Sequence, residues 1–341
     1  MLYHLPAEWQ PQSGIMFTWP HANSYWDPIL AETEKFYAQL IREIAIDEKV
    51  LLICYDEKIV RDFLKREAVN VTNVRFCQIP SNDVWARDHG PITVLKAGKP
   101  LLLDFTFNAW GDKYQMPLDN LITQRAHAAN AFGETPIHRV DFILEGGSIE
   151  TDGHGTLLTT RRCLLGENRN KTQNEAAITA ILKKYFGFKR ILWLSQGHIP
   201  GDDTDAHIDT LARFCDPYRI VYQGSSDPAD EFYPGLQAMV CELQQFKNYR
   251  GNPYRLVELP GISPKMSRLT GDRLPASYAN FLITNKKVIV PTYDDPSDEK
   301  ALAIIADCFP GRKVVGLTSL LLIENFGSIH CISMQLPEGV F

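Results

Sequence analysis

One cysteine and one histidine in this chain are placed where they could carry out nucleophilic chemistry. Cys331 follows Gly327-Ser328 near the end of the chain, outside the apolar runs that hold five of the other six cysteines. A nucleophilic cysteine needs a base or a positive neighbour that raises its thiolate fraction. His207 could be that base if the fold brings the two side chains together. His330 is less suited, because neighbouring side chains in a strand point to opposite faces.

Carboxylates supply the third element of this candidate chemistry. Asp88, Glu145 and Asp209 each stand near the start of an expected hairpin, in different parts of the chain. A pocket that joined them to His207 and Cys331 would repel anions and suit a cation. Guanidinium is the planar cation that carboxylates bind in a bidentate way. The residue types therefore predict attack of a thiolate on the carbon of a guanidinium group.

The acidic run from Gly201 to Asp209 allows other interpretations. Its residues His207, Asp205 and Asp209 could contribute ligands to a catalytic metal. An EF-hand calcium loop starting at Asp203 is excluded, because positions 208 and 214 would have to be Gly and Glu but are Ile and Phe. A solvated loop that caps a helix or strand is a further interpretation. The residue types alone leave metal binding, acid–base chemistry and capping open.

Five apolar hairpins are expected to position these residues, since two strand-like runs joined by a short polar turn recur along the chain. They cover residues 91–105, 148–159, 208–222, 279–292 and a shorter segment after Cys331. Counting from Asp88, Glu145, His207, Ser277 and Cys331 in turn gives spacings of 57, 62, 70 and 54 residues. Such divergent repeats predict a five-unit, pseudo-symmetric α/β propeller whose polar ends meet at one central channel. An ordinary α/β sheet without internal symmetry is the alternative.

Helical periodicity alternates with short strand-like runs, which is typical of the α/β class. The helical segments are 29–47, 58–68, 118–131, 174–186 and 297–309, and the strand-like runs after them are 50–54, 74–79, 137–143, 191–194 and 314–317. A chain of 341 residues could form about two domains by length alone. Because no Pro-, Gly- or Ser-rich linker divides it, we expect a single catalytic domain over residues 1–341.

Composition and charge exclude several classes of function. With 35 Lys and Arg against 41 Asp and Glu, the net charge of −6 and the lack of a basic block argue against binding of nucleic acid or a membrane surface. The seven cysteines form no C-x-x-C pair, which favours a reducing cytoplasm over a disulfide or zinc framework. The first residues show no signal peptide, so we expect a cytoplasmic protein. The sequence leaves open whether it forms a homo-oligomer.

Several motifs, taken together in their order along the chain, make the sequence similar to a known family. The chain resembles the agmatine deiminases of the bacterial peptidylarginine deiminase family, within the guanidine-modifying enzymes of the pentein fold. The motifs are Pro6-Ala7-Glu8-Trp9, Thr18-Trp19-Pro20-His21, Trp85-Ala86-Arg87-Asp88-His89-Gly90-Pro91, Asp104-Phe105 with Phe107-Asn108-Ala109-Trp110-Gly111, Glu145-Gly146-Gly147-Ser148-Ile149, Asp203–Asp209, Ala276-Ser277-Tyr278-Ala279-Asn280-Phe281 and Ile329-His330-Cys331-Ile332. The resemblance runs nearly from end to end and implies the five-unit propeller of that family.

The resemblance also implies a reaction and a role for each site residue. It implies hydrolysis of agmatine, a small cationic guanidine, to N-carbamoylputrescine and ammonia, with no metal or organic cofactor. By position, Cys331 matches the nucleophile, His207 the general acid and base, and Glu145 the acid that orients the histidine. Asp88 and Asp209 match the pair that holds the guanidinium nitrogens. An aromatic residue that lines the substrate site is matched by Trp85.

Departures from the family pattern concern the substrate more than the reaction. The chain has Asn325-Phe326-Gly327-Ser328 where longer members have a run of glycines, Asp205-Ala206 where they have Asn-Gly, and Asp112 where they have Gly. Asp203 is the candidate for binding the distal amine of agmatine. The alternatives are a deiminase of free or peptide C-terminal arginine, whose carboxylate would need Arg161, Arg162 or Arg273, an amidinotransferase, a metal-dependent hydrolase, and a non-catalytic guanidine- or polyamine-binding protein.

Overall fold

The computed structural model describes residues 3–225 and 227–341. These residues form two compact units, each built from separate stretches of the chain. Unit 1 contains residues up to Trp9, Gly147–Ile283 and Lys287–His330. Unit 2 contains Gln10–Gly146, Thr284–Lys286 and Cys331–Phe341. The chain therefore passes from one unit to the other between His330 and Cys331.

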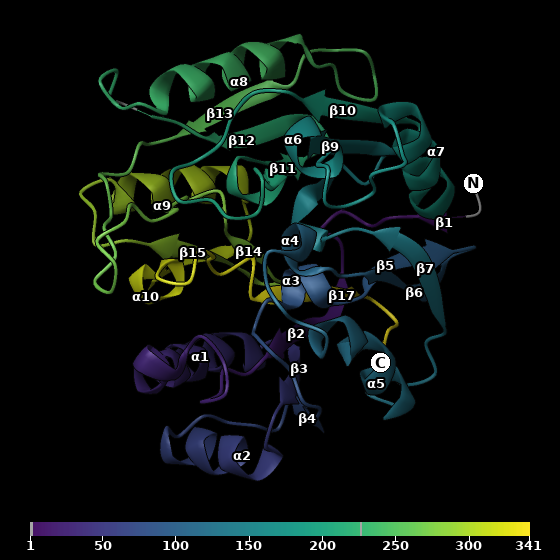
Figure 1. Cartoon of the computed structure of the whole chain (residues 1–341), viewed down its shortest axis with the longest axis vertical. Helices are drawn as coiled ribbons and strands as arrows, with labels where there is room; N and C mark the ends of the chain where they lie inside the picture. The colour runs from purple at the N-terminus through teal and green to yellow at the C-terminus, as the bar shows by residue number, and fades with distance from the viewer. Residues whose placement is uncertain (1–2, 226) are drawn as a thin grey trace. The chain divides into compact units, whose positions relative to one another are not determined.

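Unit 1 holds three small sheets of the same topology, within the residues that the structure describes (Figure 1). In each sheet two strands form an antiparallel hairpin, and a helix then leads to a third strand parallel to the second. The first sheet has β8 (Ile149–Thr151), β9 (Thr156–Thr160), α7 (Glu175–Phe186) and β10 (Arg190–Leu194); the second has β11 (Ala212–Asp216), β12 (Arg219–Gln223), α8 (Tyr233–Gln245) and β13 (Arg255–Leu259); the third has β14 (Leu282–Ile283), β15 (Lys287–Thr292), α9 (Asp298–Cys308) and β16 (Lys313–Thr318).

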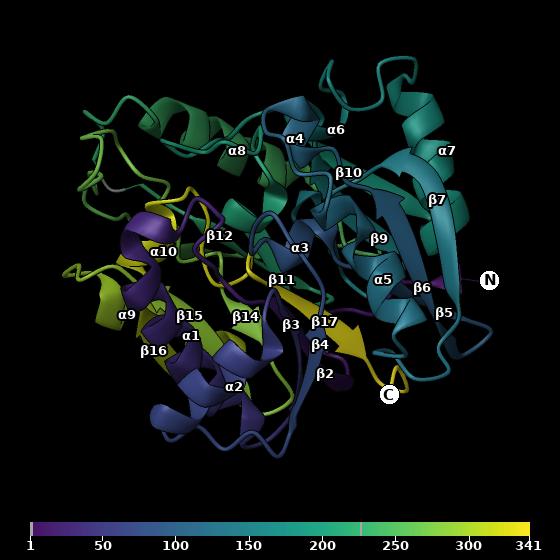
Figure 2. The same cartoon turned by 60° about the horizontal axis from the view of Figure 1, so that its bottom comes forward.

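Unit 2 repeats this topology in the sheet of β5, β6 and β7, and its second sheet has a further parallel strand and α1 and α2 beside it (Figure 2). The first sheet has β5 (Ile92–Lys96), β6 (Lys99–Thr106), α5 (Ile122–Ala128) and β7 (Ile137–Ile143); the second has β2 (Gln12–Thr18), α1 (Leu30–Ala45), β3 (Lys49–Cys54), α2 (Glu57–Arg66), β4 (Val74–Gln78) and β17 (Ser333–Pro337). The strand expected after Cys331 is β17. It pairs antiparallel with β2, at the other end of the chain, and not with a local hairpin partner.

The remaining described elements are short. They are β1 (Tyr3–His4), α3 (Ala86–His89), α4 (Ala109–Asp112), α6 (Arg161–Leu164), α10 (Leu320–Ile323) and four 3₁₀ turns, η1 (Asp27–Ile29), η2 (Asp119–Leu121), η3 (Gly146–Ser148) and η4 (Ile208–Thr210). Several of them carry candidate site residues, because the loops at the ends of the hairpins are where the sequence places its polar groups. No helix among the described residues is long and apolar enough to span a bilayer.

Helix α7 illustrates how the local sequence determines an element. Asn174 caps its first turn, because its side-chain oxygen accepts a hydrogen bond of 2.9 Å from the amide of Ala177. Ile178, Leu182 and Phe186 follow at intervals of four residues and are buried on one face. Gly187 ends the helix at φ +74°, and a Cβ there would lie only 2.0 Å from the carbonyl oxygen of Tyr3. Only glycine fits this helix end.

The expected alternation of helices and strands is confirmed, and the α/β class with it. The five predicted helical segments correspond to α1, α2, α5, α7 and α9. Their ends agree with the prediction within two residues, except at α5, which is shorter at both ends. Helix α8 and strands β2 and β13 were not predicted. The single domain over residues 1–341 stays a prediction, since the described residues divide into two units.

Candidate active site

Three of the five predicted catalytic residues lie on segments of unit 2 that touch one another. The amide of Arg87 donates a hydrogen bond of 3.0 Å to the carbonyl oxygen of Cys331, which joins α3 to the C-terminal segment. Gly146 lies against the same place, because a Cβ there would be 2.2 Å from the carbonyl oxygen of Arg87 and 2.9 Å from the methyl group of Met334. Unit 2 therefore brings the segments of Cys331, Asp88 and Glu145 together, and all three side chains are buried.

Aromatic side chains of unit 2 surround Asp88 and Trp85. The indole nitrogen of Trp110 donates a hydrogen bond of 2.9 Å to Oδ2 of Asp88. The ring of Trp85 lies edge-on to Trp110 at 6.4 Å and tilted to Trp26 at 5.7 Å, measured between centroids. Asp83 accepts hydrogen bonds from the indoles of Trp26 and Trp85, and burial nevertheless raises its pKa to about 6. Trp85 is therefore held within a packed aromatic cluster.

The segment that carries Trp110 has an unusual backbone. Ala109, Trp110, Gly111 and Asp112 all have positive φ, between +52° and +88°. Residues other than glycine rarely adopt this region, and a run of them is typical of functional sites where the surrounding structure holds the strain. The residue that departs from the family pattern, Asp112, belongs to this run.

His207 and Asp209 both lie in unit 1. His207 directly precedes the 3₁₀ turn η4, and Asp209 is its second residue. The amide of His207 donates a hydrogen bond of 3.1 Å to Oγ1 of Thr204, and the hydroxyl of Thr210 donates to the carbonyl oxygen of His207 at 2.9 Å. The imidazole is buried, and one of its nitrogens lies within 4.8 Å of the sulfur of Cys163 on α6. The backbone on both sides of His207 is therefore held, as a positioned general acid and base requires.

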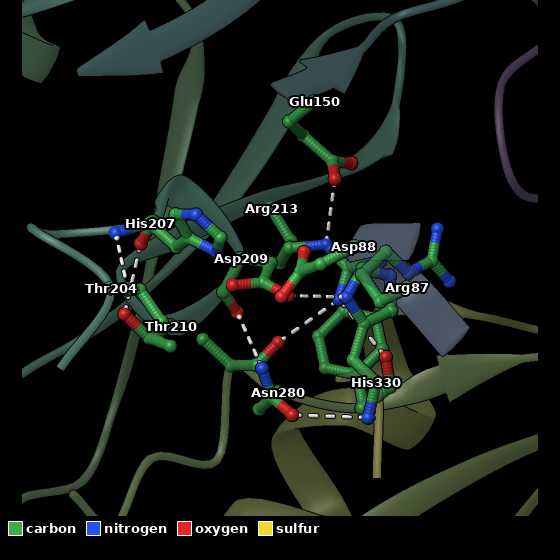
Figure 3. A network of polar contacts seen from close by, with 12 residues as sticks. Arg87, Asp88, Glu150, Thr204, His207, Asp209, Thr210, Arg213, Asn280 and His330 are labelled. Carbon is green, nitrogen blue, oxygen red and sulfur yellow. Dashed lines mark hydrogen bonds and ion pairs between the residues drawn. The ribbon is translucent and has the colours of Figure 1, made fainter. Parts of the chain in front are cut away.

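Asp209 belongs to a buried network of charged groups within unit 1, which Figure 3 shows. Its Oδ2 lies 2.7 Å from Nδ1 of His330, and Nε2 of His330 lies 2.9 Å from Oε1 of Glu8. Glu8 also binds the guanidinium of Arg213. The Nε of Arg213 donates to Oε2 of Glu150 at 2.7 Å (Figure 3). Charges alternate along this chain of contacts, so each buried carboxylate has a cationic or donor group beside it.

The surroundings of Asp209 favour its ionised form. Burial by itself raises the pKa of this carboxyl, but the hydrogen bond and charge of His330 and the charges of His207 and Arg213 outweigh it, and the net effect lowers the pKa. Asp209 has no exposed side-chain surface. A fixed buried carboxylate of this kind can hold a guanidinium without first losing water.

The acidic run before His207 holds its own loop together. Asp202 accepts hydrogen bonds from the amide and hydroxyl of Thr204 and from the amide of Ala206. Asp205 forms an ion pair of 2.7 Å with the buried guanidinium of Arg169. Two of the three proposed metal ligands, Asp205 and Asp209, therefore already bind side chains of the protein, which favours the capping interpretation over the metal site. Asp203 is half-buried.

The structure thus gathers the predicted residues into two groups. Unit 2 has Cys331, Asp88, Glu145 and Trp85, and unit 1 has His207, Asp209 and Asp203. Chain connectivity adds one firm link, since the Cα atoms of consecutive residues are about 3.8 Å apart and His330, the partner of Asp209, immediately precedes Cys331.

Several neighbours of these residues were not predicted. Sequence reasoning did not find Glu8, Glu150, Arg213, Asn280 and His330 as members of one network. The side-chain oxygen of Asn280 accepts a hydrogen bond of 3.0 Å from the amide of His330, and its side-chain amide donates to the carbonyl oxygen of Asp209 (Figure 3). Glu8, Asn280 and His330 do occur in the quoted motifs, and this was the only signal that could have pointed to them.

Comparisons with known proteins agree over nearly the whole chain. The model of a family described as Porphyromonas-type peptidyl-arginine deiminase matches residues 4–337. A Vibrio parahaemolyticus protein that carries the provisional name agmatine deiminase is 34% identical, over 98% of this chain and 97% of its own length.

Solved structures give the same picture. A C. jejuni agmatine deiminase, in a cysteine-to-serine variant with substrate bound, is 38% identical with a TM-score of 0.92, over 99% of this chain and 97% of that one. A Porphyromonas gingivalis protein provisionally called an arginine deiminase is 44% identical with a TM-score of 0.93, over 99% of both chains. DDAH from Pseudomonas aeruginosa and an amidinotransferase from Microseira wollei, 13% and 12% identical with TM-scores of 0.50 and 0.52, share only the α/β fold.

Proposed function

Because this chain belongs to the family of Porphyromonas-type peptidyl-arginine deiminases, we propose that it hydrolyses agmatine to N-carbamoylputrescine and ammonia. The observation that carries the proposal is Asp209, a buried carboxylate kept ionised by His330, whose next residue is Cys331. In the proposed reaction a guanidinium bound to Asp209 is attacked by the thiolate of Cys331, the residue that follows His330. The C. jejuni relative, named an agmatine deiminase, supports agmatine as the substrate.

In the proposed reaction the carboxylates position the substrate and the thiolate attacks it. Asp88 and Asp209 bind the guanidinium nitrogens and keep the group positive, which makes its central carbon electrophilic. The Cys331 thiolate forms a C–S bond with that carbon, and the C=N electron pair moves onto nitrogen. His207 donates a proton to the leaving nitrogen, and the C–N bond breaks with its electron pair to release ammonia.

The covalent amidino-thioether is then hydrolysed by reversing the roles of the same groups. Neutral His207 removes a proton from water, and the resulting hydroxide oxygen bonds to the carbon. The C–S bond breaks and its electron pair returns to sulfur. The hydroxyl proton is lost to solvent as the C=O bond forms, and the ureido product leaves. Glu145 orients His207 and raises its basicity, as the acid of a triad does. Trp85 lines the substrate site, and Asp203 binds the distal amine.

This function requires that the polar loops at one end of each of the five sheets come together. We propose that the five repeats of hairpin, helix and parallel strand form a five-unit propeller and act as one catalytic domain over residues 1–341. Each repeat then delivers a polar loop to the same channel. Four of the sheets within residues 3–225 and 227–341 contain a hairpin followed by a helix and a parallel strand, and in the fifth β17 takes the place of the hairpin strand beside β2, which supports this arrangement.

Arginine is the second candidate substrate, because the P. gingivalis relative carries the provisional name arginine deiminase. An arginine substrate needs a cation for its carboxylate. Of the three candidates, Arg161 forms an ion pair of 2.8 Å with Glu175, and Arg273 binds both oxygens of Asp230. Each would have to leave its partner, whereas the single amine of agmatine needs only a carboxylate. These contacts favour agmatine.

The proposal is tested by measuring release of ammonia and of the ureido product from agmatine, free arginine and a C-terminal arginyl peptide under the same conditions. We expect turnover of agmatine by the unchanged protein. Cys331→Ser should bind agmatine without turnover, and Cys241→Ser, at an exposed cysteine on α8, should keep normal activity as the matched control. Turnover of agmatine by Cys331→Ser would refute the mechanism, and turnover of arginine alone would refute the substrate.

A further inference from the structure

His330 is a buried histidine whose two ring nitrogens both face carboxylates. Nδ1 lies 2.7 Å from Oδ2 of Asp209, and Nε2 lies 2.9 and 3.1 Å from the two oxygens of Glu8. The imidazole has no exposed surface, and neither carboxylate is more than 8% exposed. In the reaction steps proposed above His330 neither contacts the substrate nor transfers a proton.

The two hydrogen bonds of the His330 ring indicate how many of its nitrogens carry a hydrogen. A carboxylate can only accept a hydrogen bond, and a neutral imidazole has a single N–H. Two ionised carboxylates on the two nitrogens therefore need the imidazolium form, in which both nitrogens donate. A buried imidazolium between two carboxylates forms two charge-assisted hydrogen bonds, which are stronger than neutral ones.

The wider network holds Glu8 in place. Its Oε2 binds the buried guanidinium of Arg213, which is held by Glu150 as well and by the carbonyl oxygens of Ala279 and Phe281. Glu8 therefore sits between two cations, His330 and Arg213. The charged or titratable groups recorded around Asp209 itself are His330, His207 and Arg213, and all three favour its ionised form.

The backbone holds His330 as firmly as its side chain. Its amide donates to the carbonyl oxygen of Asn280 at 3.2 Å and to the side-chain oxygen of the same residue at 3.0 Å. The side-chain amide of Asn280 in turn donates to the carbonyl oxygen of Asp209 (Figure 3). The imidazole has no freedom to leave Asp209 without breaking contacts at both ends.

From these contacts we propose that His330 is a positioning residue, which holds Asp209 ionised and oriented for the guanidinium group of the substrate while Glu8 holds the imidazole. The inference rests on the proposed function, in which Asp209 binds the guanidinium. One oxygen of Asp209 is fixed by Nδ1, so the carboxylate can meet the substrate in only one orientation. The adjacent residue is Cys331, so the same short segment sets both the carboxylate and the nucleophile.

Replacing His330 by asparagine or by glutamine tests its two ring nitrogens separately. The amide nitrogen of asparagine occupies nearly the place of Nδ1, so His330→Asn keeps the donor to Asp209 and loses the donor to Glu8. The amide nitrogen of glutamine occupies nearly the place of Nε2, so His330→Gln keeps the donor to Glu8 and loses the donor to Asp209. A residue that serves only packing would respond in the same way to both changes.

The experiment measures agmatine binding by calorimetry in the Cys331→Ser background, where no turnover occurs. We expect His330→Gln to weaken binding about 10- to 100-fold, the loss typical of a hydrogen bond to a charged group. His330→Asn should weaken it by less than about fivefold. His198→Gln, at a half-buried histidine after β10, is the matched control and should bind as the unchanged protein does. Equal binding by the Asn and Gln variants would overturn the proposal.

The pH dependence of turnover gives a second readout. Without the His330 donor, only the charges of His207 and Arg213 oppose the effect of burial, and the pKa of Asp209 rises. The acid limb of kcat/KM should therefore move to higher pH in His330→Gln. If that variant does not fold, Glu8→Gln replaces it and should move the limb in the same direction by a smaller amount. An unchanged acid limb in the variant used would overturn the proposal.

A third readout does not depend on the substrate. Because both ring nitrogens face carboxylate oxygens, the ¹⁵N signals of His330 in the protein without ligand should show a hydrogen on each of them. A single protonated nitrogen would overturn the proposal even if agmatine is turned over. If the Cys331→Ser protein binds no agmatine while His330 is doubly protonated, the function proposed for the chain is wrong, and the substrate-positioning role falls with it.

Discussion

Arg213 gives the sharpest test of the buried network, because its removal leaves two carboxylates facing each other. The side chain, on β11, has no exposed surface. It binds Glu8 and Glu150, donates to the carbonyl oxygens of Ala279 and Phe281 at 3.2 and 2.9 Å, and has its guanidinium carbon 4.7 Å from the ring centroid of Phe281. Arg213→Met keeps most of the apolar stem and deletes the charge.

The expected loss of stability follows from what remains after this change. Breaking a buried ion pair by removing one partner costs about 3–5 kcal/mol, against a total of about 5–15 kcal/mol for a typical protein. Glu150 keeps the hydrogen bond of 3.1 Å from the amide of Phe214, and Glu8 keeps His330. Because these contacts partly compensate, we expect about 3 kcal/mol.

The loss should also depend on pH. Burial raises the pKa of Glu150, and the charge of Arg213 opposes it. Without Arg213 this pKa rises further above its value in the unfolded chain. A carboxyl with a raised pKa contributes stability that is complete below the unfolded pKa and is lost as the pH rises through the folded one. Arg213→Met should therefore be more destabilised at pH 8 than at pH 5.5.

Urea unfolding at these two pH values measures the prediction. Glu8→Gln and Glu150→Gln added to Arg213→Met should recover part of the loss, since the buried groups are then neutral. Lys58→Met is the control, because Lys58 is 87% exposed and its pair with Asp62 should be worth less than about 0.5 kcal/mol. A loss below about 1 kcal/mol in Arg213→Met, or the same loss at both pH values, would refute the reasoning.

Two further predictions concern unit 2. Gly146→Ala places a Cβ 2.2 Å from the carbonyl oxygen of Arg87 and should lower the unfolding free energy by about 3 kcal/mol. Gly98→Ala is the control, with φ of +81° and open space around it, and should lower the unfolding free energy by about 1 kcal/mol. Equal losses of the two variants in urea unfolding would contradict this prediction. The pKa of Asp83 rises from 3.8 to about 6, which corresponds to about 3 kcal/mol of stability present below pH 3.8 and lost as the pH rises through 6. The stability of Asp83→Asn relative to the unchanged protein should therefore improve from pH 4.5 to pH 7, and a difference that does not vary with pH would show that Asp83 does not titrate in this range.

Much of the fold could be predicted from the sequence because it depends on local patterns. The turns between β8 and β9 and between β11 and β12 carry Asp152-Gly153 and Asp216-Pro217, and the apolar strands on either side are short enough to pair directly. Helix α7 begins at a capping asparagine and ends at a glycine. Signals of this kind are complete within about ten residues, so tertiary structure has little to add to them.

The elements that were missed depend on partners far away in the chain. Strand β2 contains Ser13 and Gly14, which do not favour strands, and it is fixed by β17 on one side and β3 on the other. Helix α8 begins with Tyr233-Pro234-Gly235, which indicates a turn, and buries only Leu236, Met239 and Leu243. Cys241 on this helix is exposed, although its apolar neighbours had predicted a buried position.

The treatment of His330 shows where reasoning from local pattern fails at a site. His330 was set aside as a partner of Cys331 on the assumption that both lie in a strand, but β17 begins only at Ser333. Its actual partners, Asp209 and Glu8, are 121 and 322 residues away, so no spacing rule could have linked them. The prediction that the carboxylates bind a guanidinium came from residue types alone, which could not indicate the groups that hold Asp209.

The placement of the charged network has a consequence for how substrate binding and chemistry are linked. Glu8 is the second-last residue of the first stretch of unit 1, and His330 is the last residue of its final stretch. His330, which contacts Asp209, and Glu8, which holds His330, therefore both lie close to a point where the chain enters unit 2. Cys331 directly follows His330, and its carbonyl oxygen is held by Arg87, the neighbour of Asp88. A change at His330 therefore acts on the backbone that carries the nucleophile as well as on Asp209. For this reason the contrast between the Asn and Gln variants carries more information than the loss caused by either one, since both replace the same residue and only one removes the donor to Asp209.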